Sequence, residues 1–68
     1  MSAVIRVNGK EEALAVATVA ELLAARGILR GKGVAVALNG AVVPASAWDK
    51  APLAIGDEVE IVKPFGGG

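Results

Sequence analysis

The segment AVIRVNGKEEALAVATVAELL, residues 3–23, contains the change of hydrophobic period on which the fold depends. In its first part the residues alternate between two faces, so that Ile5 and Val7 lie on one side of a predicted strand. Asn8-Gly9 follows at once, and this pair tolerates the positive φ values of a tight hairpin turn. The segment therefore predicts a second strand that folds back on the first and runs to about Val16.

After this hairpin the spacing becomes that of a helix. Thr18-Val-Ala-Glu21 fits a capping box, in which the threonine side chain accepts from a free amide of the first turn and the glutamate reaches back. The apolar face of this predicted helix comprises Val19, Leu22 and Leu23. Gly27 stands where a helix ends in a left-handed residue.

The second half of the chain repeats the hairpin pattern. Residues 34–38 alternate, Asn39-Gly40 predicts another tight turn, and residues 41–43 form a short return strand that Pro44 ends. No hydrophobic period is visible between Ala45 and Pro52. Trp48, within this stretch, is expected to lie over the core and cover it. A turn at Gly56-Asp57 precedes a last alternating strand, residues 58–62.

This order of elements predicts an α+β fold: a mixed sheet of four to five strands with one main helix packed on one face. We expect the first and last strands to run parallel at the centre, which is the ubiquitin-like β-grasp arrangement, although other small α+β layouts fit the order alone. The expected organisation is a β-grasp domain at residues 1–63 and a flexible glycine tail at residues 64–68.

Composition excludes several classes of function. The 68 residues include no Cys and no His, which removes thiol nucleophiles, disulfides, Ser-His pairs and the usual zinc sites, so neither a metal nor a bound cofactor is expected. A formal net charge of zero argues against nucleic-acid binding. The longest uncharged run, residues 33–48, is too short to span a membrane, and the start is unlike a signal peptide. A cytoplasmic domain, monomeric when free, is the expectation.

The body of the chain carries no catalytic constellation. Glu58 and Glu60 share one face of a strand like paired carboxylates, but a solvated outer face near Lys63 explains them better. Asp57 is expected to serve the turn in which it stands. We therefore do not expect an enzyme.

The C-terminus differs from the body. Gly66, Gly67 and Gly68 follow Pro64-Phe65 and form a tail without side chains that ends in a carboxylate. Such a tail can enter a partner enzyme's tunnel, where the carboxylate is activated as an acyl adenylate. A disordered terminus is the alternative interpretation of three glycines.

Over nearly its whole length the sequence resembles the ThiS family of sulfur carriers in thiamine thiazole biosynthesis. The matching elements, in order, are IRVNG at residues 5–9, TVAELL at 18–23, VALNG at 36–40, VVP with a following Trp at 42–48, and GDEVEIV at 56–62 before the terminal glycines. Their order and spacing make the resemblance specific.

The resemblance implies a mechanism. The carboxylate of Gly68 would be adenylated by an E1-like enzyme that consumes ATP, and converted to a thiocarboxylate with sulfur from a cysteine desulfurase or another donor. Thiazole synthase would then receive the sulfur. Gly67 would complete the family's Gly-Gly end. Gly66 would add flexible length to the tail, at a position where the residue varies within the family.

Partner contacts and rival functions stay open at this point. Phe65 is a candidate anchor in a partner pocket, and Ala35, Ala37 and Val62 are candidates for a small-residue patch on the outer sheet face. The rivals are the small subunit of molybdopterin synthase, a noncovalent β-grasp binding module with an inert tail, and a ubiquitin-like modifier that transfers its glycine to a lysine.

Overall fold

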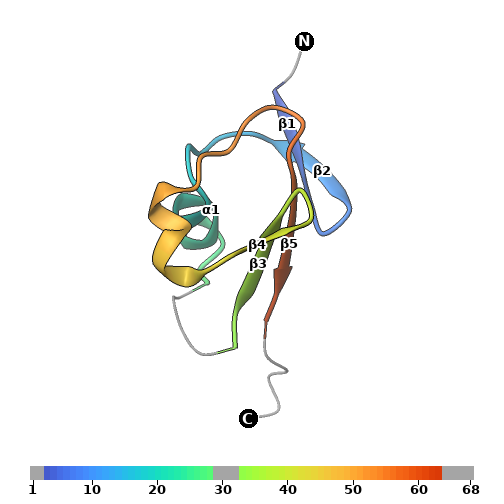
Figure 1. Cartoon of the computed structure of the whole chain (residues 1–68). Coiled ribbons are helices and arrows are strands. Elements are labelled where there is room, and N and C mark those ends of the chain that lie inside the picture. Colours follow the sequence, from blue (N-terminus) through green and yellow to red (C-terminus); the bar gives the residue numbers. More distant parts are fainter. Residues whose placement is uncertain (1–2, 29–32, 64–68) are drawn as a thin grey trace.

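Five strands form one mixed sheet in the computed structural model, which describes residues 3–28 and 33–63 (Figure 1). The elements are β1 (Val4–Val7), β2 (Lys10–Ala13), α1 (Val19–Ala25), β3 (Ala35–Leu38), β4 (Ala41–Val43), a 3₁₀ helix η1 (Ala45–Lys50) and β5 (Glu58–Val62). The strand order across the sheet is β2-β1-β5-β3-β4.

The arrangement confirms the predicted β-grasp fold. β1 and β5 run parallel at the centre, with Arg6 opposite Glu58 and Val7 opposite Val59. Each hairpin adds one antiparallel edge strand, β2 beside β1 and β4 beside β3. β3 pairs with β5 in antiparallel fashion and joins the two halves of the sheet.

Both Asn-Gly pairs form the predicted hairpin turns. Asn8 and Gly9 have φ of 52° and 84°, and Asn39 and Gly40 have φ of 51° and 86°. Positive φ at both central residues is the condition for the turn whose twist matches paired strands. A two-residue turn also fixes which residues face each other across the hairpin.

The prediction for the second strand was too long. β2 ends at Ala13. The last hydrogen bond of this hairpin runs from the Leu14 amide to the Ala3 carbonyl at 2.9 Å. Because β1 begins at Val4, residues after Leu14 face no strand to pair with, and they lead directly to the helix.

The helix has the predicted boundaries and one unpredicted detail. The Thr18 hydroxyl accepts from the Glu21 amide at 3.2 Å, as in a capping box. The Glu21 carboxylate accepts from the amide of Ala17, at 2.8 Å, one residue before the cap. At the other end Gly27 has φ of 73°, and the Ile28 amide donates to the Leu23 carbonyl, which completes a left-handed helix stop.

The 3₁₀ helix η1 was not predicted, because residues 45–52 have no apolar period. It carries Trp48 into the core, where the indole is 2% exposed and its Nε1 donates to the Val43 carbonyl at 2.9 Å. The expectation that Trp48 covers the core is therefore confirmed.

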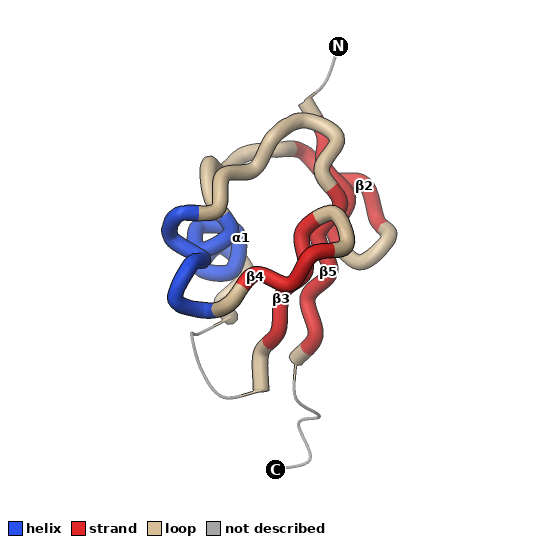
Figure 2. The backbone as a smooth tube through the Cα atoms, in the orientation of Figure 1, coloured by secondary structure: helices blue, strands red, loops and turns tan. Residues whose placement is uncertain are grey.

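The core lies between one face of the sheet and the two helices, which share the same side (Figure 2). Its buried members are Ile5, Val7, Val19, Leu22, Leu23, Val36, Trp48, Leu53, Val59 and Ile61. No helix or strand of the described residues covers the opposite face of the sheet.

Candidate functional site

The outer face of the sheet brings the predicted patch residues together. Ala35 stands directly opposite Val62 in the antiparallel pairing of β3 and β5. Ala37 lies two residues farther along the same face of β3. Val62 is 62% exposed although it is apolar. The three residues proposed from the sequence therefore adjoin.

Val42 belongs to the same surface and was missed in the sequence. It stands opposite Ala37 in the β3–β4 hairpin and is 77% exposed. The signal was present, because a two-residue turn at Asn39-Gly40 fixes this pairing. We call Ala35, Ala37, Val42 and Val62 the outer apolar patch.

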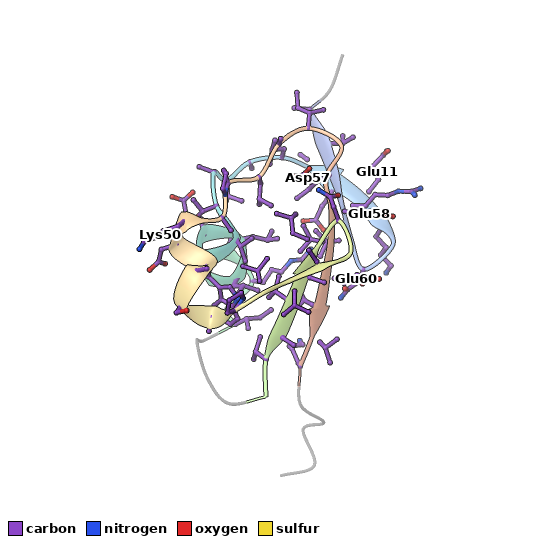
Figure 3. All side chains as sticks on the ribbon, in the orientation of Figure 1. Glu11, Lys50, Asp57, Glu58 and Glu60 are labelled. Carbon is purple, nitrogen blue, oxygen red and sulfur yellow. The ribbon has the colours of Figure 1, made fainter. Side chains whose placement is uncertain are left out.

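Carboxylates border this patch. Glu60 stands opposite Ala37 on the β5 side, and Glu58 stands two residues nearer the start of β5. Figure 3 shows Glu11, Glu58 and Glu60 on the side of the molecule away from Lys50 and the helices. The Glu58 carboxylate lies 4.0 Å from the Arg6 guanidinium, with both side chains more than half exposed. The predicted solvated face is confirmed, and such an ion pair contributes little to stability.

The strand that leads toward the tail is held at its start by a polar cluster. The Asn39 side chain accepts from the Glu58 amide at 2.9 Å and donates to the Asp57 carboxylate at 3.0 Å. The other Asp57 oxygen accepts from the Ala54 amide at 2.8 Å, which confirms the turn role predicted for Asp57. This cluster ties the β3–β4 turn to the first residue of β5.

A second asparagine holds the end of β5. The Ile61 amide donates to Asn8 Oδ1 at 2.8 Å, and Asn8 Nδ2 donates to the Ile61 carbonyl at 3.3 Å. The sequence predicted only the turn role of each asparagine. Their contacts with β5 were missed because nothing in the local pattern indicates a partner 53 residues away for Asn8 or 19 residues away for Asn39.

Comparison with known proteins decides the family. The family model described as the ThiS family matches residues 4–68, which include every strand, the helix and the terminal glycines. The chain belongs to the ThiS family.

Two solved structures resemble this ThiS family member closely. One is the crystal structure of the thiamine biosynthesis protein ThiS from Geobacter metallireducens, with 37% identity, a TM-score of 0.76, and coverage of 96% of this chain and 99% of that one. The other is the solution NMR structure of a thiamine biosynthesis protein from Geobacter metallireducens, also at 37% identity and TM-score 0.76, with coverage of 100% and 88%. Among curated proteins, none matches the chain.

The tail of this family member lies outside the described residues. The sequence-based assignments for Phe65, Gly66, Gly67 and Gly68 therefore stay predictions. The structure describes the chain up to Lys63, one residue after β5 ends.

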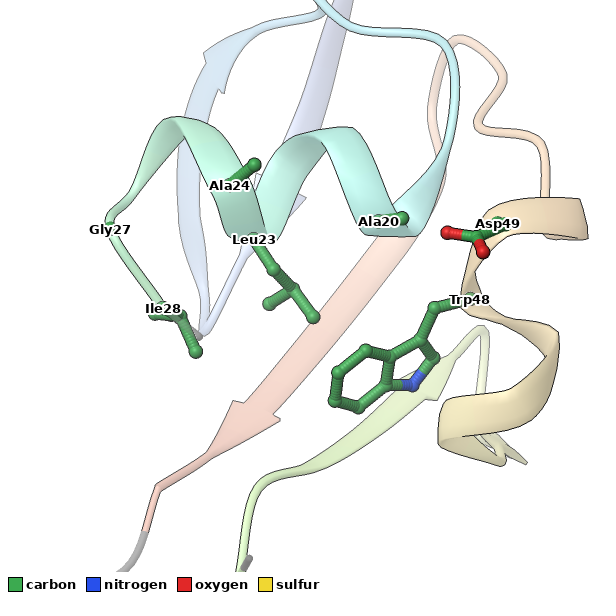
Figure 4. A pocket seen from close by; sticks show the side chains of 7 residues that line it. All are labelled: Ala20, Leu23, Ala24, Gly27, Ile28, Trp48 and Asp49. Atoms are coloured by element: carbon green, nitrogen blue, oxygen red, sulfur yellow. The ribbon is translucent and has the colours of Figure 1, made fainter. Parts of the chain in front are cut away.

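A cleft of about 450 Å³ lies on the helix side of this ThiS family member, between α1 and η1 (Figure 4). Its lining is apolar apart from Asp49, and comprises Ala20, Leu23, Ala24, Gly27, Ile28, Trp48 and Asp49. A single carboxylate in apolar surroundings supplies neither a nucleophile with its base nor a metal site. The described lining of the cleft therefore offers no groups for these two kinds of chemistry.

Among residues 3–28 and 33–63 no cluster of acidic residues is arranged to hold a metal ion. No helix in that part of the chain is long and apolar enough to cross a membrane. What the structured part offers is an open sheet face and a central strand that runs toward the C-terminal residues.

Proposed function

We propose that the protein is a sulfur carrier for thiamine thiazole synthesis, a protein co-substrate rather than an enzyme. The observation that carries the proposal is the family match, which extends through the terminal residue 68. The thiamine biosynthesis names of the two related structures support the same pathway over the molybdopterin synthase small subunit, whose tail chemistry is similar.

The reaction requires only the C-terminal carboxylate of this chain. An oxygen of the Gly68 carboxylate attacks the α-phosphorus of ATP on an E1-like enzyme, and pyrophosphate leaves. A persulfide sulfur that originates from a cysteine desulfurase or another donor then attacks the carbonyl carbon and AMP leaves, which gives an acyl disulfide. A thiol reductant cleaves its sulfur–sulfur bond, becomes oxidised to a disulfide, and releases the thiocarboxylate. Thiazole synthase finally accepts the sulfur. ATP is consumed by the partner, so this chain needs no cofactor.

Gly66 and Gly67 serve as the narrow part of the tail. A side chain at either position would restrict φ and widen the segment that must enter the partner's tunnel. The outer apolar patch is proposed as the docking surface, and Phe65 is proposed as a separate anchoring contact. An exposed patch of this kind is a better indicator of a binding surface than a single exposed residue.

Mass spectrometry of the intact chain tests the proposal. After incubation with the E1-like enzyme, ATP and a sulfur donor, we expect the mass to rise by one oxygen-to-sulfur exchange. A chain that lacks Gly68 is the control and is expected to stay unchanged. No mass change in the wild-type chain would contradict the proposal, and a product linked to a lysine would point to a protein modifier instead.

A further inference from the structure

The pairing of β1 with β5 stops before β5 ends. The Arg6 amide donates to the Asp57 carbonyl and the Asn8 amide donates to the Val59 carbonyl, both at 2.9 Å. In a continued parallel ladder the Asn8 carbonyl would next accept from the Ile61 amide. Instead the backbone turns away at Asn8, where φ is 52°.

The Asn8 side chain takes the place of the missing peptide group. A primary amide has the same donor and acceptor as a peptide unit, and this one contacts both the amide and the carbonyl of Ile61. The ladder is therefore extended by one step beyond the last residue of β1. Without that step the β1 side of Ile61 would have no protein partner for its amide among the described residues.

This step lies two residues before Lys63, where the described chain leaves the sheet. Beyond Ile61 the described pairing of β5 is with β3 alone, through Val62 and Ala35. A strand end that is bonded on one side only opens more easily than one bonded on both. Because of the Asn8 side chain, β5 is therefore bonded on both sides as far as Ile61.

We infer that Asn8 is a positioning residue for the reactive tail: it keeps Ile61 in the sheet and so fixes the direction of the chain toward the Gly68 carboxylate. The inference rests on the proposed function. An activating enzyme that binds the sheet face and the tail together meets a chain whose exit is already ordered. It then does not have to order the end of β5 during binding.

Asn39 provides a matched control for this inference. It occupies the same position in the other Asn-Gly turn, has nearly the same φ, and also bonds β5 through its side-chain amide. Its bonds are to Glu58 at the start of the strand and to Asp57 just before it, at the end remote from the tail. Glycine accepts positive φ, so Asn8→Gly and Asn39→Gly each keep the turn and remove only the amide group.

Amide hydrogen exchange, followed by NMR, measures the contact itself. In Asn8→Gly the Ile61 amide is expected to exchange about tenfold faster, because its hydrogen-bond acceptor is lost, while the Glu58 amide changes little. Asn39→Gly is expected to show the opposite pattern. Asn8→Asp keeps an acceptor for the Ile61 amide but loses the donor to its carbonyl, so an intermediate rate is expected. Equal rates at Ile61 in wild type and Asn8→Gly would overturn the inference.

The kinetics of adenylation measure the consequence. At a temperature where all variants are fully folded, Asn8→Gly is expected to raise KM for the carrier about fivefold and to leave kcat within twofold, since the loss is in ordering before chemistry. Asn39→Gly is expected to match the wild type. An equal effect of both variants would show general destabilisation and overturn the inference. If the wild-type chain is not adenylated, the proposed function fails, whereas the exchange at Ile61 still reports the Asn8 contact.

Discussion

Trp48 combines an apolar and a polar role in a core built mainly from aliphatic side chains. Its ring is 2% exposed, and its Nε1 donates to the Val43 carbonyl, the last residue of β4. The bond ties η1 to the edge of the sheet. Trp48 is the only tryptophan in the chain, and it also lines the cleft between η1 and α1.

Replacement of Trp48 by phenylalanine separates these roles. Phenylalanine keeps much of the apolar contact but leaves the Val43 carbonyl without this donor and creates a small cavity. We expect the free energy of unfolding to fall by about 1–3 kcal/mol, the range for an unsatisfied buried acceptor. Urea unfolding followed by circular dichroism measures the change, since the variant lacks tryptophan fluorescence. A stability equal to that of the wild type would show that the bond contributes nothing.

Gly27 tests the helix stop independently of packing. Its φ is 73°, and a methyl group placed there would meet no atom within 4 Å. Any loss of stability in Gly27→Ala therefore comes from the left-handed backbone conformation, which costs an L-residue about 1–2 kcal/mol. Gly27→Asn is the matched control and should lose less, because asparagine tolerates this conformation better. Equal losses in the two variants, measured by urea unfolding, would assign the effect to something other than φ.

At the scale of elements, what could be predicted depended on whether the determining contact is local. The two hairpins were predictable because Asn8-Gly9 and Asn39-Gly40 fix turn and register within a few residues. The pairing of Ala35 with Val62 was not, since it depends on how β3 packs against a strand that arrives much later in the chain. The helix η1 was missed because a six-residue 3₁₀ helix leaves no readable period.

The outer apolar patch makes a prediction about docking. Val42→Glu places a charge at the β4 edge of the patch, on an exposed edge strand, so the free energy of unfolding should change by less than about 0.5 kcal/mol. If the patch contacts the activating enzyme, KM for adenylation should rise about tenfold, because the variant buries an unpaired charge in the interface. The measurement is adenylation at several carrier concentrations.

Ile55 supplies the control for Val42. It is 69% exposed and apolar, but it lies in the loop before β5 rather than on the outer apolar patch. Ile55→Glu introduces the same charge at a comparable exposure. We expect it to leave KM within twofold of the wild type, and an effect as large as that of Val42→Glu would argue against a defined docking surface.

At the scale of the whole molecule, the folded body and the reacting group are separate parts of the chain. The buried core residues of the described part of the chain lie between Ile5 and Ile61, whereas the proposed reaction concerns Gly68. The absence of Cys and His left only the terminal carboxylate as a group of unusual chemistry in the sequence. The fold then adds what composition could not: a central strand that precedes the tail in the sequence, and a sheet face that no described helix or strand covers.

This separation predicts that a chain ending at Phe65 folds normally but cannot react. It keeps every described contact, so its free energy of unfolding should stay within about 0.5 kcal/mol of the wild type. Lacking Gly66, Gly67 and Gly68, it should remain unadenylated. Because it retains the outer apolar patch and Phe65, it should compete with the full chain for the E1-like enzyme, with an inhibition constant within about threefold of the wild-type KM if most of the binding energy comes from these contacts.

The competition assay distinguishes two ways in which the carrier can be recognised. Adenylation of the full chain is measured at rising concentrations of the shortened one, and a combined variant, shortened and carrying Val42→Glu, is the control. Inhibition by the first and not by the second places recognition on the sheet face. If the shortened chain does not inhibit at all, recognition depends on the glycine tail itself, and the folded body serves only to present it.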